Sequence, residues 1–162
     1  METATLTFTH LQDALNVFID DFVKTYKSLL KRDNKKATGN LISSIQPLEL
    51  DFAADRYTGS ISLASYWKYV EYGRRKGGKF PPFNKILEWV RVKPVIPRPI
   101  NGIKPTEKQL TFLICRKIAR DGIEAGNQYK EALDIVWARV YQLISDAISL
   151  DLSEAINLIT LK

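Results

Sequence analysis

Apolar side chains recur at helical spacing near both ends of this chain, and this pattern constrains its fold most. Near the start they are Leu11, Leu15, Phe18, Phe22, Tyr26 and Leu29, and near the end Leu133, Trp137, Val140, Tyr141, Ile144 and Ile148. Spacings of three and four place such residues on one face of a helix. The sequence therefore predicts two long terminal helices. The second pattern either continues to Ile159 or breaks near residues 149–151.

Between these helices, two short runs alternate apolar and polar residues. They are Leu48–Ala53 and Thr58–Ala64. Alternation is typical of a half-exposed strand, so we expect the runs to pair as an antiparallel ribbon, with a turn at Ala54–Arg56. Short helices are expected at Tyr66–Tyr72 and Phe83–Val92. The predicted fold class is α+β: a small antiparallel β-sheet packed by long N- and C-terminal helices plus short helices.

The chain has 162 residues, which predicts a single domain over residues 1–162. Three prolines within Lys93–Pro99 exclude a central strand and predict an extended, Pro-rich arm at about 93–105. After the arm, Thr106 and Gln109 have the spacing of a capping box, and Gly122 is placed to end the helix that follows.

Charge is unevenly distributed along the chain. The net charge of +6 divides into −2 for residues 1–30, +12 for residues 31–120 and −4 for residues 121–162. A basic segment attracts nucleic acid or an acidic protein neighbour through long-range fields. The same asymmetry would let copies of the chain attract one another, acidic ends against a basic middle. No stretch of about 18 apolar residues occurs, so no membrane span is expected.

Residue types needed for catalysis or metal binding are scarce. The only histidine is His10, and the only cysteine, Cys115, lies in an apolar run that favours a buried thiol. A zinc site needs about four such ligands. The sequential acidic pair Asp20 and Asp21 diverges around a helix rather than converging on an ion. We therefore expect no catalytic, metal-binding or cofactor-binding residues, and no enzymatic activity.

Arg74–Lys79 is a glycine-containing basic loop without the spacing of a phosphate-binding P-loop. Three interpretations stay open: a solvated loop, a docking element for an acidic protein, or a contact with a nucleic-acid backbone. The candidate partner-binding residues combine this loop with cations of the arm. They are Arg74, Arg75, Lys76, Lys79, Lys93, Arg98 and Lys104.

Four short segments stand in a distinctive order. They are Thr38–Ile45, Tyr69–Gly73, Lys79–Pro82 with Ile86, Trp89 and Val90, and Ile118–Ile123. Their order resembles that of the neck and tail-completion proteins that join head to tail in tailed bacteriophages. The match departs from the family in two places: Lys36 stands one place further from Thr38 than the usual basic residue, and Arg74 replaces the usual Thr.

The resemblance implies a non-enzymatic virion protein without cofactors. It implies a subunit of a ring, typically of six or twelve copies, at the portal–tail junction, where it acts as an adaptor or as a tail-completion or seal component. The implied partners are further copies of the chain, the portal or connector, and tail proteins. The implied location is the neck or tail region of a virion assembled in the bacterial cytoplasm. The resemblance spans roughly residues 36–135.

A second function class is a basic nucleic-acid-binding protein. It would contact the DNA backbone through residues 74–79 and 91–104, with affinity that falls steeply as salt rises. The two classes differ in what they predict for the purified chain: a higher oligomer in the first, salt-sensitive DNA binding in the second.

Overall fold

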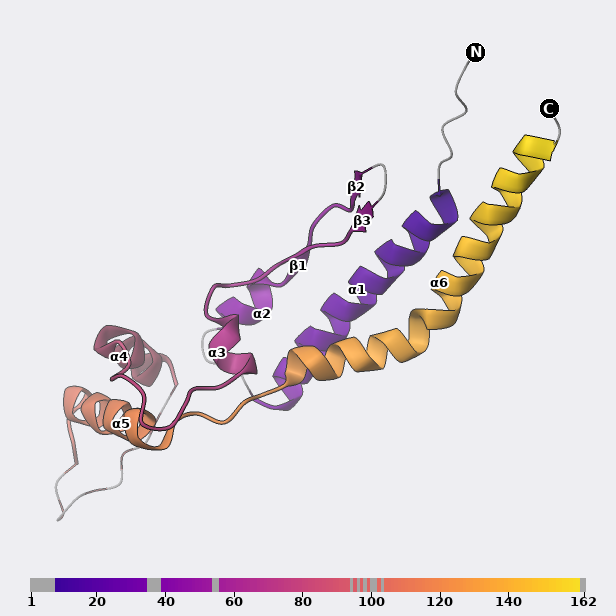
Figure 1. Ribbon diagram of the computed structural model, residues 1–162. Helices are drawn as coiled ribbons and strands as arrows, with labels where there is room; N and C mark the ends of the chain where they lie inside the picture. Colours follow the sequence, from indigo (N-terminus) through magenta and orange to yellow (C-terminus); the bar gives the residue numbers. More distant parts are fainter. Residues whose placement is uncertain are drawn as a thin grey trace. The chain divides into compact units, whose positions relative to one another are not determined.

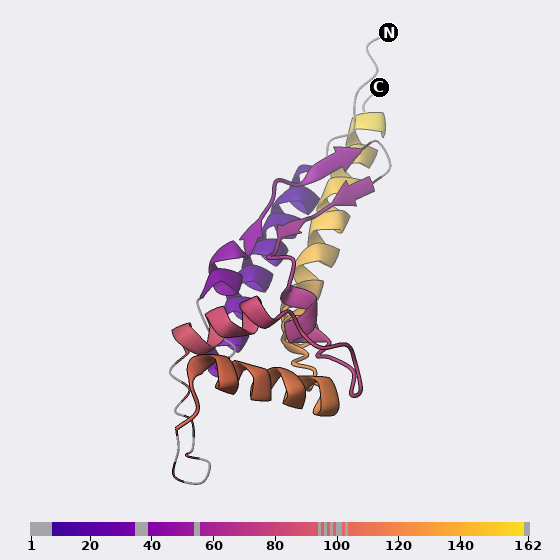
Figure 2. The same ribbon diagram turned by 90° about the vertical axis from the view of Figure 1, so that its left-hand side faces the viewer.

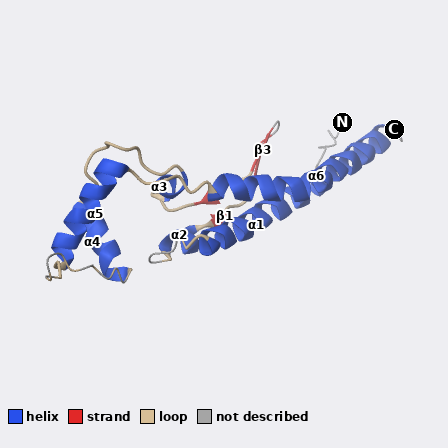
Figure 3. Cartoon of the chain, turned by 90° about the horizontal axis from the view of Figure 1, so that it is seen from below, coloured by secondary structure: helices blue, strands red, loops and turns tan. Residues whose placement is uncertain are grey.

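Helices dominate the computed structural model of the chain, which describes residues 8–34, 39–53, 56–93, 95, 97, 99, 102 and 104–160 (Figure 1). Strands are few and short (Figure 3). The predicted α+β class with long terminal helices is therefore confirmed. The elements are α1 Thr9–Arg32, α2 Asn40–Ser44, β1 Gln46–Pro47, β2 Asp51–Ala53, β3 Arg56–Thr58, β4 Ile61–Ser62, α3 Trp67–Glu71, α4 Phe83–Val92, α5 Glu107–Asp121 and α6 Gln128–Thr160.

The chain divides into two compact units, each assembled from separate stretches of sequence. Unit 1 comprises residues 1–29, 45–62 and 129–162, and unit 2 comprises residues 30–44 and 63–128. Helix α1 contributes residues to both units. The prediction of a single domain over residues 1–162 stays a prediction.

In unit 1, α1 and α6 run antiparallel and contact each other along much of their length. The rings of Phe22 and Tyr129 lie 5.0 Å apart, and those of Phe18 and Trp137 lie 6.0 Å apart. An ion pair of 3.2 Å joins Arg139 to Asp21. The buried residues of α6 are mostly small, which suits the close approach of another element. Those that belong to unit 1 are Ala132, Val136, Val140, Ala147, Asp151 and Ala155.

Helix α6 continues without a break through residues 149–151, although it bends along its length (Figure 1). The question that the sequence left open is therefore resolved in favour of a single helix of 33 residues. Part of the predicted stripe faces outward, however: Val140 is buried, whereas Trp137 and Tyr141 are exposed.

Two short antiparallel ladders form the predicted ribbon, and the arrows of β2 and β3 point in opposite directions in Figure 2. Pro47 pairs with Ile61, and Asp51 pairs with Thr58. Between these two pairs, the first half of the ribbon contains four residue steps and the second half only three. One extra residue on the first side is the mark of a β-bulge. Opposite it lies Gly59, where a Cβ would stand 2.6 Å from Cδ1 of Ile19. Of the predicted turn, residues 54 and 55 lie outside the described residues.

In unit 2, α4 and α5 pack side by side (Figure 2). An ion pair of 3.0 Å between Arg91 and Glu107 joins the end of α4 to the start of α5. The predicted capping box is confirmed, since Thr106 and Gln109 bond each other's backbone N–H groups. Helix α3 begins one residue later than the predicted Tyr66–Tyr72, with Tyr66 as its N-cap and no side-chain cap.

A close backbone contact joins the end of α3 to the end of α5. The N–H of Arg74 donates to the carbonyl of Ile123 at 2.8 Å, and the N–H of Ile123 donates back at 2.9 Å. Gly73 and Gly122, with φ of +67° and +78°, precede these two residues. A Cβ at Gly73 would lie 2.2 Å from the Ile123 carbonyl oxygen, and one at Gly122 would lie 2.4 Å from that of Arg74. We call these four residues the glycine crossing.

Candidate interaction surfaces

The basic loop of residues 74–79 is anchored to the end of α5 through the glycine crossing. The Arg74 side chain turns back on the loop, where its Nη2 donates to the carbonyl of Lys79. The side chains of Arg75, Lys76 and Lys79 are exposed. Three of the four predicted loop cations are therefore available to a partner, while Arg74 supports the shape of the loop.

Two of the other predicted cations, Lys93 and Lys104, belong to the opposite end of α5. Lys93 is half-buried, with its ammonium 5.8 Å from the centre of the Trp89 ring. Lys104 is exposed, and Arg98 lies outside the described residues. Since the Arg91–Glu107 pair ties this region to the start of α5, the predicted set does not form one cluster but is divided between the two ends of that helix.

The exposed side of α5 carries further cations that sequence reasoning missed. Lys108, Arg116 and Lys117 are exposed, and they accompany two large apolar residues, Phe112 and Leu113. The ring of Phe80 lies 5.8 Å from that of Phe112 and widens the apolar area. We call these six residues the α5 face. The sequence contains a signal for this surface, because positions 108, 112 and 116 lie four residues apart and therefore share one side of a helix.

Helix α6 presents a line of large apolar side chains to solvent. Trp137 is 50% exposed and Ile156 is 61% exposed. The spacings of three, four and seven make successive members neighbours on the helix surface, in a row that winds gradually around α6. We call this row the α6 stripe: Leu133, Trp137, Tyr141, Ile148, Leu152, Ile156 and Ile159. Because large exposed apolar patches often mark binding sites, the α6 stripe is a candidate interaction surface.

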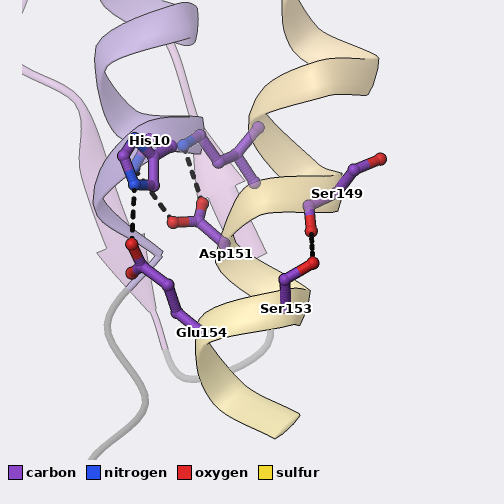
Figure 4. Close-up of polar contacts among 6 residues, drawn as sticks. His10, Ser149, Asp151, Ser153 and Glu154 are labelled. Atoms are coloured by element: carbon purple, nitrogen blue, oxygen red, sulfur yellow. Dashed lines mark hydrogen bonds and ion pairs between the residues drawn. The ribbon is translucent and has the colours of Figure 1, made fainter. Parts of the chain in front are cut away.

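His10, Asp151 and Glu154 form a polar cluster in unit 1 (Figure 4). The Asp151 carboxylate, which is buried, accepts the backbone N–H of His10 at 3.1 Å and that of Leu11 at 2.8 Å. Nε2 of His10 lies 3.2 Å from Oε1 of Glu154. Metal-ligand atoms of the three residues lie within 4.8 Å of one another. Both Asp151 oxygens are nevertheless occupied by N–H groups at the positive end of α1, so the cluster acts as a helix cap supplied from α6.

The contact between His10 and Glu154 predicts a pH-dependent stability. The hydrogen bond to Glu154, supported by the charges of Asp151 and Asp13, raises the pKa of His10 above 6.5. A raised pKa stabilises the folded chain at low pH, and this contribution is lost as pH rises through the folded pKa. Chemical unfolding of wild type and His10→Gln should differ most near about pH 5.5 and least near about pH 8.5.

Glu154→Gln provides the control for this measurement, because it leaves the imidazole in place without its carboxylate partner. In the Glu154→Gln background, the stability gap caused by His10→Gln should change much less with pH. A gap that stays constant with pH in the wild-type background would contradict the prediction.

Two further titratable residues, Cys115 and Asp121, lie in surroundings that do not favour catalysis. Cys115 is fully buried, as the sequence predicted, and burial raises the pKa of its thiol, which disfavours the reactive thiolate. The hydrogen bonds from Arg120 lower the pKa of Asp121, and the pair sits on the surface at the end of α5. Neither arrangement places a nucleophile beside a base.

The two units differ sharply in charge. By sequence, unit 1 contains 6 Lys or Arg and 12 Asp or Glu, a net charge of −6. Unit 2 contains 18 and 6, a net charge of +12. The α6 stripe therefore belongs to an acidic unit and the α5 face to a basic one.

Among the described helices, none is long and apolar enough to cross a membrane. Comparisons of the chain with protein-family models, with curated proteins and with solved structures found no match.

Proposed function

We propose that this chain is a structural subunit that assembles with copies of itself into a ring at the head–tail junction of a tailed bacteriophage. The observation that carries the proposal is the α6 stripe, because seven large apolar side chains in one row are costly to leave in water. A neighbouring protein surface would remove them from solvent.

The segments that resemble phage neck and tail-completion proteins support the same proposal. Tyr69–Gly73 ends at one glycine of the glycine crossing, and Ile118–Ile123 contains the other, so both segments lie at this backbone contact within unit 2. Motif residues that fix the course of the backbone are expected in an adaptor protein, because its function depends on the shape of the surfaces that it presents. Of the segment Thr38–Ile45, Thr38 lies outside the described residues, as do Lys36 and Ala37 before it.

In this proposal the chain is made in the bacterial cytoplasm and becomes part of the virion neck or tail, where it acts as an adaptor or as a tail-completion or seal component. Its partners are further copies of itself, the portal or connector, and tail proteins. The exposed cations of the 74–79 loop would face an acidic neighbour or the packaged DNA. No chemical transformation is assigned to it.

The mass of the purified chain tests the proposal. Light scattering and native mass spectrometry should give a closed oligomer, with six or twelve times the 18.5 kDa of one chain, alone or once the portal is added. Electron microscopy of the same sample should show rings. A chain that stays monomeric at high concentration and with portal present would contradict the proposal. If that monomer bound DNA with an affinity that falls steeply with salt, the result would favour the alternative of a nucleic-acid-binding protein.

A further inference from the structure

Two exposed surfaces of this chain have matching chemistry. The α6 stripe is apolar, and from residue 140 to residue 160 its helix contains three acidic residues and no basic one. The α5 face combines apolar Phe80, Phe112 and Leu113 with three cations. One surface therefore offers an apolar row on an acidic helix, and the other an apolar centre among basic residues.

We propose that the α6 stripe of one copy docks on the α5 face of the next copy. This inference rests on the proposed self-assembly and specifies which surfaces meet. Both surfaces contribute apolar side chains to the centre of the contact, and burying them supplies the main driving force. The exposed cations Lys108 and Arg116 would meet the exposed carboxylate of Asp134, which lies beside the α6 stripe.

The charges favour this pairing over contacts between identical surfaces. Two α6 helices side by side would bring together units of net charge −6, and two α5 faces would bring together units of net charge +12. Like charges across an interface repel, whereas the pairing of α6 with α5 joins opposite signs. Complementary charge also speeds encounter and fixes the relative position of the partners.

When two copies join through two different surfaces, the pair still has one free α6 stripe and one free α5 face. Such a head-to-tail contact repeats until the rotation between neighbours closes a ring, or it extends as a filament if the rotation does not close. The inferred pairing therefore accounts for a ring without a second type of interface. It also predicts that salt weakens the assembly, since the charge contribution is screened.

The test reverses the charges on each side separately and then together. One variant carries Lys108→Glu and Arg116→Glu, a second carries Asp134→Lys, and a third carries all three changes. Each of the first two should raise the dissociation constant between subunits at least about tenfold, and the third should recover most of the loss. The matched control is Lys68→Glu with Lys85→Glu, which changes the net charge as the first variant does at two exposed positions outside both the α5 face and the candidate partner-binding residues.

Variants that change no charge separate the contribution of apolar contact to assembly from the contribution of charge. Leu152→Gln with Ile156→Gln removes apolar surface from two exposed positions of the α6 stripe, so it should weaken assembly without loss of helical signal in circular dichroism. If the wild type forms rings but both charge-reversed variants and the glutamine variant assemble equally well, the inferred pairing is wrong and the proposed function stands. A wild type that never associates would overturn the proposed function itself.

Discussion

Gly73→Ala is expected to lower the free energy of unfolding by about 3 kcal/mol. The backbone at Gly73 has a φ of +67°, which costs a residue with a side chain on the order of 1–2 kcal/mol. The added methyl would also lie 2.2 Å from the carbonyl oxygen of Ile123 and 2.7 Å from the nitrogen of Ala125. These neighbours are backbone atoms, so relief requires the glycine crossing to open. Urea unfolding followed by circular dichroism measures the loss.

Gly77→Ala is the matched control for this prediction. Gly77 has a similar φ of +72°, but a Cβ there would meet nothing within 4 Å. It should therefore show only the conformational cost, about 1 kcal/mol. The difference between the two variants isolates the steric contribution of the crossing. Equal losses at Gly73 and Gly77 would mean that the close backbone approach does not contribute to stability.

Asp151→Ala is expected to cost about 2 kcal/mol of unfolding free energy. The substitution removes the buried carboxylate that accepts both the His10 and the Leu11 N–H groups, and it leaves these donors unpaired at a half-buried helix end. An unpaired buried N–H loses its hydrogen bond to water without replacement. The same change removes a negative charge from the positive end of α1. Thermal and urea unfolding both measure the effect.

Two further substitutions give this second prediction its control. Asp151→Asn keeps one acceptor oxygen but no charge, so its loss should be smaller than that of Asp151→Ala. Asp146→Ala removes an exposed carboxylate from the same helix and should change stability by no more than about 0.5 kcal/mol. If Asp151→Ala is as mild as Asp146→Ala, the cap supplied by α6 is not a stabilising feature of the fold.

Local patterns in the sequence predicted most of the elements. The spacing of apolar residues located α1, and the positions of Thr106, Gln109 and Gly122 located both ends of α5. These signals are local, because a cap, a proline or a left-handed glycine acts within a few residues of its own position. The β-bulge opposite Gly59 was not predicted, since strand register depends on which partner residues pair across the turn.

The interaction surfaces were predicted less well than the elements. Helical periodicity grouped Trp137 and Tyr141 with buried Val140, because a pattern of apolar residues does not tell which side of the stripe another element covers. The small residues Ala132 and Ala147 turned out to mark the buried side. The capping of α1 by Asp151 joins residues about 140 positions apart, and no local rule connects them. For the same reason the α5 face, which includes Phe80 from outside the helix, was not recognised.

The interleaved order of the two units has a consequence for synthesis of the chain. Unit 2 ends at residue 128, the first residue of α6, so all of its residues have been made before the rest of α6 is translated. Helix α1, by contrast, is translated before the other elements. The part of its apolar side that contacts α6 stays uncovered until α6 has been translated. Folding of nascent chains proceeds from the N-terminus as residues emerge from the ribosome. The basic unit is therefore complete before the acidic one, and the proposed docking through the α6 stripe becomes possible only once α6 itself has been translated.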